Sequence, residues 1–426
     1  MKKFMTLAAV LCCCQLASAQ MPRQQQQMPD FKFTTIDSLA ITSVKNQGNS
    51  GTCWAYAGMG FIESEILRTQ GKAYDLSEMY VALNTYMERA EKAVRTSGDV
   101  SFSQGGDFGD ILVTMERFGM VPDSEMQAGA MYGKETTAHT ELSAFTDQMV
   151  AAASKLRTMQ VSAEDGEQLY KKALRAVHEV YLGKAPESFT YEGKEYTPMS
   201  FAKSLGINSK DYVSLTSFMH HPYSTGENIG VGYAMEAQDN WRWALSINME
   251  LDDFCQVFED AIKNGYTILW GSDVSEAGFS RQGVAVINDV KVVESTVSSD
   301  QIRLVGADPQ VAQQRGKAEP QPQKVVTPEE RQAMYDGRQT TDDHAMQIFG
   351  IAQDQFGQKY FMVKNSWGDK SGNFKGIYYV TPEYVRAKTL NILVNKGAVS
   401  AELKAKYGIT DNTVVLNKKA KKSKKK

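Results

Sequence analysis

In the first half of the chain, apolar residues recur at intervals of three and four, the spacing of a helix that buries one face. Between residues 53 and 67, Phe61, Ile62 and Ile66 follow this spacing, and small residues nearby allow close packing. The same pattern predicts further helices over residues 76–94, 109–118, 143–159, 166–181 and 252–264. We expect the pair at 143–159 and 166–181 to be inserted on the surface.

The second half of the chain has a different pattern, made of short β-branched or aromatic runs that turn residues separate. These runs predict strands over residues 266–271, 284–287, 346–351, 360–364 and 376–380, arranged as an antiparallel sheet or barrel. Residues 306–330 are rich in Gln, Pro and Ala and should form an exposed loop. A helical first half and a strand-rich second half indicate an α+β fold of two lobes, with a cleft expected at the junction of the lobes.

Residues 1–19 have the layout of a secretory signal peptide: a basic start, an apolar run over 4–16, and a small-residue cleavage site that ends at Ala19. We expect cleavage after Ala19 and an exported protein, periplasmic or secreted. A membrane anchor is the alternative, but the apolar run is too short to cross a bilayer and no other long apolar stretch follows. Lipidation at Cys12 is a weaker alternative, because the preceding Leu11 is not small.

The chain has 426 residues, of which 42% are hydrophobic, so it can bury one large core or two modest ones. Its charge is unevenly distributed. Residues 20–30 are rich in Gln and Pro without an apolar period, and we interpret them as a disordered spacer. The net charge is −3, but seven lysines lie in the last nine residues. Without these lysines, Lys2 and Lys3, the net charge is −12, which argues against nucleic-acid binding by the body. The Lys-rich tail, 417–426, should be solvated.

Cysteine is scarce once the signal peptide is removed, since Cys53 and Cys255 are the two that remain. Two cysteines are too few for a disulfide framework, although a single Cys53–Cys255 bridge stays open as an alternative. Cys53 follows the flexible run 48–52 and stands where the first helix should begin. A helix N-terminus favours a thiolate through its partial positive charge and unpaired N–H groups. Cys53 is therefore a candidate nucleophile.

A thiolate nucleophile needs a base and a group that orients the base, and the chain has five histidines. Four of them lie in the predicted surface helices or in a loop, where a solvated or structural role is the better interpretation: His139, His178, His220 and His221. His344 opens a predicted strand, and Asn365 ends the next strand, so the two should lie side by side. Trp367 could shield their contact from water, and Gln47 could donate from its amide to an oxyanion.

Three segments together resemble the active-site segments of papain-like cysteine peptidases, in the order Cys, His, Asn: QGNSGTCWAY, DHAMQIFGI and VKNSWG. The resemblance implies that Cys53 is the nucleophile, that His344 is the general base and acid, and that Asn365 orients the imidazole. It also implies that Gln47 is the oxyanion donor and that the neighbouring Trp54, Asp343 and Trp367 support the site.

Two features separate the chain from papain itself. Ser50 stands where papain-like enzymes usually place a half-cystine, and Cys53 and His344 are 291 residues apart instead of roughly 130–150. The additional sequence resembles the bleomycin hydrolase and aminopeptidase C branch, through segments at 76–91, 105–124, 183–204, 211–218 and 261–275. This resemblance covers most of residues 36–416. It implies a papain-like peptidase domain over 31–416, a large helical insertion at about 125–260, and hexameric assembly of aminopeptidase subunits.

The chain departs from that branch at both ends. Its members are mostly intracellular, and they usually end in an apolar arm that presents the terminal carboxylate to the substrate's α-ammonium group. Here TVVLN (413–417) is followed by lysines, and a lysine-rich end is a poor partner for an ammonium group. We therefore predict an exported cysteine aminopeptidase acting on peptides, with an endopeptidase of the same fold and an inactive exported binding protein as alternatives. No motif predicts a metal, a cofactor, a nucleic-acid partner or a membrane span.

Overall fold

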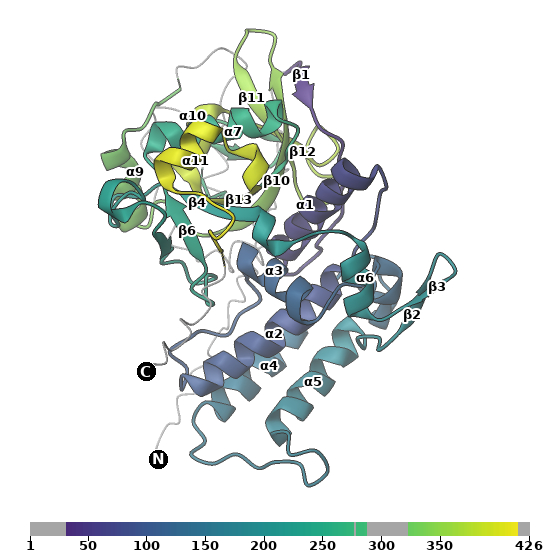
Figure 1. The fold of residues 1–426 in the computed structure, drawn as a ribbon. Coiled ribbons are helices and arrows are strands. Elements are labelled where there is room, and N and C mark those ends of the chain that lie inside the picture. Colours follow the sequence, from purple (N-terminus) through teal and green to yellow (C-terminus); the bar gives the residue numbers. More distant parts are fainter. Residues whose placement is uncertain (1–30, 277, 288–322, 416–426) are drawn as a thin grey trace, which may run out of the picture.

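The computed structural model describes residues 31–276, 278–287 and 323–415. The predicted signal peptide, the spacer, the Lys-rich tail and most of the predicted loop at 306–330 lie outside these residues. Figure 1 shows two parts, a helical part and a part that carries a large sheet, with helix α1 (Cys53–Gln70) between them. The two-lobe α+β fold predicted from the sequence is confirmed.

The long helices follow the predicted apolar pattern within a few residues. They are α2 (Glu78–Arg95), α3 (Phe108–Arg117), α4 (Thr140–Ala153), α5 (Leu169–Leu182) and α7 (Leu251–Lys263). Helix α4 ends before the predicted residue 159, and Leu156 beyond it is exposed. The prediction missed four short helices: α6 (Pro198–Ser204), α9 (Pro328–Asp336), α10 (Pro382–Lys388) and α11 (Ala401–Tyr407). Each follows a Ser or Thr that caps it, a local signal that apolar periodicity does not capture.

One sheet of eleven strands dominates the second part. In spatial order its main path runs through β5 (Gly232–Ala234), β6 (Leu245–Asn248), β4 (Tyr212–Thr216), β13 (Thr389–Asn395), β7 (Ile268–Ser272), β10 (His344–Gln353), β11 (Lys359–Lys364), β12 (Ile377–Val380), β9 (Val284–Ala285) and β8 (Phe279–Ser280). Strand β1 (Thr34–Ser38) pairs with β10, and a separate hairpin joins β2 (Phe189–Tyr191) to β3 (Lys194–Tyr196). The predicted antiparallel arrangement needs correction, because β12–β9 and β4–β6 are parallel and the sheet is mixed.

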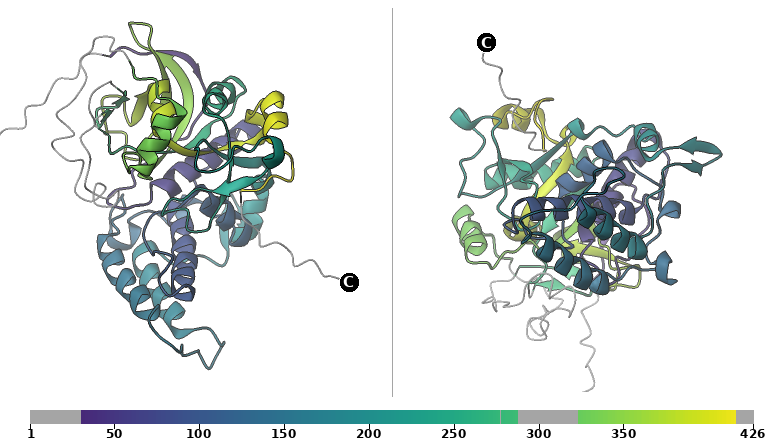
Figure 2. Two further views of the ribbon diagram at one scale, coloured as in Figure 1. Left: turned by 90° about the vertical axis from the view of Figure 1, so that its left-hand side faces the viewer. Right: turned by 90° about the horizontal axis from the view of Figure 1, so that it is seen from below.

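Two apolar cores support the two parts, and α1 belongs to the helical one. That core includes Trp54, Phe61 and Ile66, whereas the second core packs α7 against the sheet through residues such as Phe258 and Trp270. Helix α1 also packs against β10, so the start of α1 and the start of β10 meet at the junction of the two cores. Figure 2 shows the helical part projecting away from the sheet.

The helical pair α4 and α5 was predicted to lie on the surface, and one face of it does not. His139, which precedes α4, and His178 on α5 are both fully buried beside Tyr86 of α2. The other face carries exposed apolar side chains such as Phe145 and Val180. In the described residues, no helix combines the length and the hydropathy that a membrane span requires.

Candidate active site

Cys53 is the first residue of α1, as the sequence predicted. The chain reaches it through a turn in which Gly48 adopts a positive φ of 58°, and an added Cβ at Gly48 would collide with the Thr137 backbone. Thr52 precedes the helix, but its hydroxyl bonds Ser50 Oγ at 2.5 Å and does not cap the helix. Cys53 therefore stands at the N-terminal end of α1, where the partial positive charge of the helix favours a thiolate.

His344 and Asn365 come together as two neighbouring strands predicted. Strands β10 and β11 pair antiparallel, and His344 Nε2 lies 2.7 Å from Asn365 Oδ1. An amide oxygen can only accept, so Nε2 carries the proton in this bond and Nδ1 is the basic nitrogen of the neutral ring. The Trp367 ring packs against the imidazole with 4.9 Å between centroids, and His344 and Asn365 are both buried.

Cys53 and His344 line one cleft, which encloses about 310 Å³ of space partly open to solvent. Its walls come from α1, the loop before α3, the starts of β10 and β13, and the segment before β6. The cleft is also lined by Trp54, Gly106, Asp107, Asp239, Asp342 and Asn391. The expected cleft at the junction of the lobes is therefore present, and it holds both the candidate nucleophile and the candidate base.

Gln47, the predicted oxyanion donor, is engaged on both sides of its amide. Its Nε2 atom donates to the Ser50 carbonyl at 2.7 Å, and its Oε1 atom accepts from Ser366 Oγ at 2.7 Å. These bonds fix the amide between the loop before α1 and the segment after Asn365. An oxyanion role would require Nε2 to give up or share its bond to Ser50.

The predicted supporting residues differ in how they act. Trp54 Nε1 donates to the Gln104 carbonyl at 2.9 Å, so the indole ties α1 to the loop before α3. Asp343 accepts from the Ser275 N–H at 3.0 Å and from the Thr341 hydroxyl at 2.8 Å, which fixes the turn just before His344. Burial and the neighbouring Asp343 carboxylate raise the pKa of Asp273 well above its usual range.

The remaining histidines have structural surroundings. Burial lowers the pKa of His139 to about 3 and that of His178 to about 4, so both rings are neutral at physiological pH. His220 stacks on Tyr335 and His221 stacks on Tyr233 in a surface cluster. Of the two predicted roles, solvated or structural, the burial of His139 and His178 supports the structural one.

Cys53 and Cys255 are both free thiols, so the alternative of a disulfide between them is not realised. Cys255 lies half-buried on α7 beside Arg386, with 3.9 Å between its Sγ and the guanidinium Nη1. In the part of the chain that the structure describes, no group of three or more His, Cys, Asp or Glu side chains could hold a metal ion.

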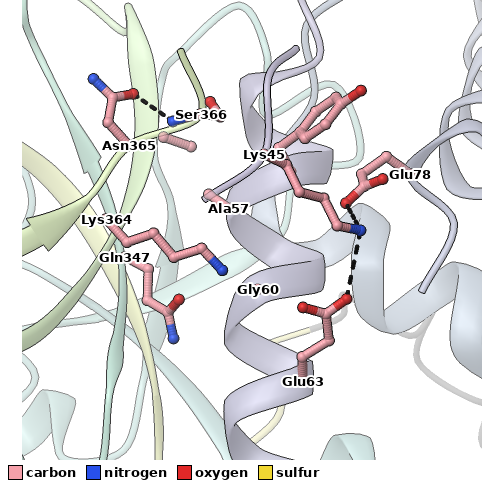
Figure 3. Close-up of a pocket in the computed structure, with 11 residues that line it drawn as sticks. Lys45, Ala57, Gly60, Glu63, Glu78, Gln347, Lys364, Asn365 and Ser366 are labelled. Atoms are coloured by element: carbon pink, nitrogen blue, oxygen red, sulfur yellow. Dashed lines mark hydrogen bonds and ion pairs between the residues drawn. The ribbon is translucent and has the colours of Figure 1, made fainter. Parts of the chain in front are cut away.

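A second polar space lies beside α1 and shares the lining residue Ala345 with the cleft; Figure 3 shows its charged side chains on both sides of the helix. Lys45 bonds Glu78 at 2.7 Å and lies 3.6 Å from Glu63, on one side of α1. On the other side, Lys364 Nζ donates to the Thr42 hydroxyl at 2.9 Å, and Thr42 donates to Glu63 at 2.5 Å. Burial disfavours the charge of Lys45, but its three carboxylate neighbours outweigh this and raise its pKa well above the usual range. We call these residues the ion network: Lys45, Glu63, Glu78 and Lys364.

Comparison with known proteins decides the family. Residues 2–301 and 328–418 match the Peptidase C1-like family. The chain belongs to this family. Aminopeptidase E of Lactobacillus helveticus is 24% identical over 91% of this chain and 89% of its own, and aminopeptidase C of Streptococcus thermophilus is 24% identical over 90% and 87%. The crystal structure of PepW from Lactobacillus rhamnosis HN001 superposes with a TM-score of 0.61 at 20% identity, covering 87% of this chain and 84% of PepW.

Membership of the Peptidase C1-like family makes the chain a cysteine-type peptidase with a papain-like fold. The predicted resemblance to the aminopeptidase C branch is confirmed by the relatives that match almost end to end.

Two carboxylates of the cleft, Asp239 and Asp342, were not among the residues predicted from the sequence. Asp342 could have been found, because it precedes His344 by two residues. Asp239 has no local signal, since its place in the cleft depends on how a distant segment folds back.

Proposed function

We propose that this Peptidase C1-like chain is an exported aminopeptidase that hydrolyses peptide bonds through a thioacyl-enzyme on Cys53. The observation that carries the proposal is the cleft that Cys53 and His344 both line, with His344 Nε2 held 2.7 Å from Asn365 Oδ1. Two relatives that match over nine-tenths of the chain carry the name aminopeptidase, which supports release of N-terminal residues.

In the proposed cycle, His344 Nδ1 takes the proton of Cys53 Sγ and an imidazolium–thiolate pair forms. The thiolate attacks the scissile carbonyl carbon, and the new negative charge on oxygen is bound by the Cys53 N–H and by Gln47 Nε2. The imidazolium then gives its proton to the leaving amine as the C–N bond breaks. His344 deprotonates a water molecule that attacks the thioester, and the carboxylic acid product leaves as Sγ recovers the proton. Asn365 keeps the imidazole in the orientation that each proton transfer needs.

The test uses two fluorogenic substrates, alanyl-aminomethylcoumarin and its N-acetylated form, under mild reducing conditions. They differ only in whether the α-amino group is free or acetylated. An aminopeptidase should cleave the free amine and spare the acetylated form. Cys53→Ala should remove the activity and leave the unfolding midpoint unchanged, because the thiolate does the chemistry. Cys255→Ala is the matched control, since it removes a thiol outside the cleft.

Two alternatives give different results in the same assay. An endopeptidase of this fold would cleave acetylated peptidyl substrates at least as well as free amines. An inactive binding protein would cleave neither, and an epoxide inhibitor of cysteine peptidases would label Cys53 no faster in the wild type than in His344→Ala.

We also propose export, on the signal-peptide pattern of residues 1–19. N-terminal sequencing of the protein recovered outside the cytoplasm should begin at Gln20, and an intact Met1 there would contradict the proposal. Family resemblance motivates a homo-hexamer, which sedimentation of the purified protein measures directly.

A further inference from the structure

The turn at residues 47–52 leads into α1, and its shape decides where the Cys53 thiol lies. Two bonds close this turn on itself: Gln47 Nε2 donates to the Ser50 carbonyl at 2.7 Å, and Ser50 Oγ donates to the Gln47 carbonyl at 2.7 Å. Cys53 and Cys255 are free thiols, so no disulfide tethers the turn to the described part of the chain. Its attachment to the rest of the molecule depends on contacts of other kinds.

Gln104, in the loop before α3, holds the chain on both sides of the candidate nucleophile. The Gly51 N–H donates to Gln104 Oε1 at 2.7 Å, two residues before Cys53. Trp54 Nε1 donates to the Gln104 carbonyl at 2.9 Å, one residue after Cys53. The first of these bonds depends on the side chain at position 104, whereas the second uses the backbone and would survive a substitution.

The other end of the Gln104 amide fixes its orientation. Nε2 donates to the hydroxyl of Ser143 on α4 at 2.7 Å. Because the nitrogen is bound to α4, the oxygen faces the Gly51 N–H. An amide turned by 180° would place its NH₂ donors against that N–H and lose the bond.

The segment before α4 also binds the turn directly, through Asn49. The Asn49 N–H donates to the Thr137 carbonyl at 2.9 Å, and the Asn49 carbonyl accepts from the His139 N–H at 2.9 Å. Its side chain adds a bond from Nδ2 to Thr140 Oγ1 at 3.1 Å. These partners belong to the stretch at about 125–260 that we predict as an insertion into the papain-like core. The insertion therefore contacts the turn directly, and indirectly through the amide bound to α4.

The loop that carries Gln104 is anchored by Arg89 of α2, whose side chain is fully buried. Arg89 Nη1 donates to the Gly105 carbonyl at 2.7 Å, and Nε donates to the Ser101 carbonyl at 2.8 Å. The same guanidinium pairs at 3.2 Å with the Asp239 carboxylate, which lies against the Gly105 backbone. One cation thus binds backbone carbonyls on both sides of Gln104, which gives the amide a fixed base.

We propose that Gln104 is a positioning residue for Cys53: its amide, oriented by Ser143, fixes the Gly51 peptide and thereby the direction in which the chain enters α1. Both Cys53 Sγ and the Cys53 N–H, which the proposed cycle assigns to the oxyanion, follow that direction. A displacement of reacting groups by about 1 Å can lower a rate by about 100-fold. This inference rests on the proposed function, because it requires Cys53 to be the nucleophile.

The experiment compares Gln104→Leu with the wild type on whichever alanyl substrate the wild type cleaves faster. Leucine removes the acceptor of the Gly51 N–H and leaves the backbone bond to Trp54. We expect kcat to fall by roughly 10- to 100-fold. KM should change less, because Gln104 does not line the cleft. Rates are expressed per Cys53 thiol that the epoxide inhibitor labels at completion, so a loss of folded protein does not count as a loss of kcat.

Gln332→Leu is the matched control, because Gln332 makes the same kind of link outside the cleft. Its Oε1 atom accepts from the Met219 N–H at 2.6 Å, and its Nε2 atom donates to Asp336 at 2.8 Å. Gln332→Leu should leave kcat unchanged. A loss equal to that of Gln104→Leu would overturn the proposal, because it would assign both losses to general destabilisation.

Gln104→Glu distinguishes positioning from a merely structural role. Its carboxylate can still accept from the Gly51 N–H, and the Ser143 hydroxyl can donate to the second oxygen, so most of the kcat should return. The added negative charge near the start of α1 disfavours the thiolate and raises its pKa, so the acid limb of kcat/KM should move to higher pH. A kcat as low as that of Gln104→Leu, or an acid limb that does not move, would overturn the proposal.

Ser143→Ala removes only the bond that orients the amide, so it should lower kcat less than Gln104→Leu does. A larger loss in Ser143→Ala would overturn the order of contacts that we propose. Should Cys53→Ala keep its activity, the proposed function fails as a whole. Loss of activity in Cys53→Ala together with a wild-type kcat in Gln104→Leu would overturn only the role of Gln104.

Discussion

Two polar spaces flank Ala345, and they handle charge in opposite ways. Beside α1, the ion network joins two lysines and two glutamates, and the exposed Asp75 is a further partner of Lys45. In the cleft, three aspartates face a space whose described walls contain no lysine or arginine. Buried charges that pair with one another serve the fold, whereas the carboxylates of the cleft line the same space as the candidate nucleophile and base. The comparison therefore separates residues that should affect stability from residues that should affect activity.

The largest expected effect comes from breaking the ion network. Lys45→Met leaves Glu63 and Glu78 buried without their shared cation, which should lower the free energy of unfolding by about 3–5 kcal/mol. Denaturant unfolding measures this loss. Burial raises the pKa of Glu78 to about 7, so the loss should shrink below pH 7 as Glu78 takes up a proton.

The double variant Lys45→Met, Glu78→Gln is the control for that experiment, and it should recover part of the stability. Asp342→Asn, in the cleft, should leave the unfolding free energy nearly unchanged. If Asp342→Asn destabilises the protein as much as Lys45→Met does, the two spaces do not differ as we describe.

Gln47 connects the two spaces, since its amide bonds Ser50 near the cleft and Ser366 beside the ion network. If Gln47 Nε2 binds the oxyanion, Gln47→Ala should lower kcat by roughly 10- to 1,000-fold with a smaller change in KM. Steady-state kinetics on the free-amine substrate measures both. A change in KM alone would contradict an oxyanion role and leave Gln47 as a residue that orders the loop before α1.

Buried histidines extend the comparison to groups that must stay uncharged. His178 has a pKa of about 4 in the folded chain and about 6.5 when unfolded, so its contribution to stability is complete above pH 6.5 and is lost as the pH falls toward 4. At pH 5 the cost should be about 2 kcal/mol. His178→Gln should therefore show a weaker fall in unfolding free energy between pH 7 and pH 5. The exposed His220→Gln is the control, and an equal effect of both variants would contradict burial as the cause.

The smallest effect is expected from the tail. Truncation after Leu416 should leave kcat/KM unchanged on free-amine and acetylated substrates, because the lysines supply no group that the proposed chemistry uses. If the lysines instead approach the acidic cleft, truncation should shift the ratio between the two substrates, and added salt should weaken that shift. Assays at low and high salt distinguish these outcomes.

The sequence predicted the parts of the molecule whose signals are local. Cys53 after a flexible turn, His344 at the start of a strand and Asn365 at the end of the next strand were all placed by periodicity and strand pairing. The burial of His178 was not, because a polar residue on an amphipathic helix gives no sign of the aromatic neighbours that enclose it. Strand β13 was missed for a related reason: its pairing with β4 and β7 joins segments far apart in the chain.

The position of Asp239 in the cleft could not be predicted from the sequence either, because it depends on contacts between distant segments. Its position in the cleft follows from five hydrogen bonds of one arginine, made to residues between Ser101 and Asp239. A pattern along the chain cannot reveal these contacts, because Arg89 and Asp239 are 150 residues apart.

The contacts of Arg89 limit which segments of this protein can be exchanged with those of its relatives. A chimera that exchanges the stretch around Asp239 but keeps Arg89 would leave a buried guanidinium facing foreign partners. A chimera that exchanges α2 alone would strand the Asp239 carboxylate beside Gly105. Arg89, Gly105 and Asp239 therefore need to be exchanged together, although they lie in three segments of the chain. Chimeras whose crossovers separate these residues should fold poorly.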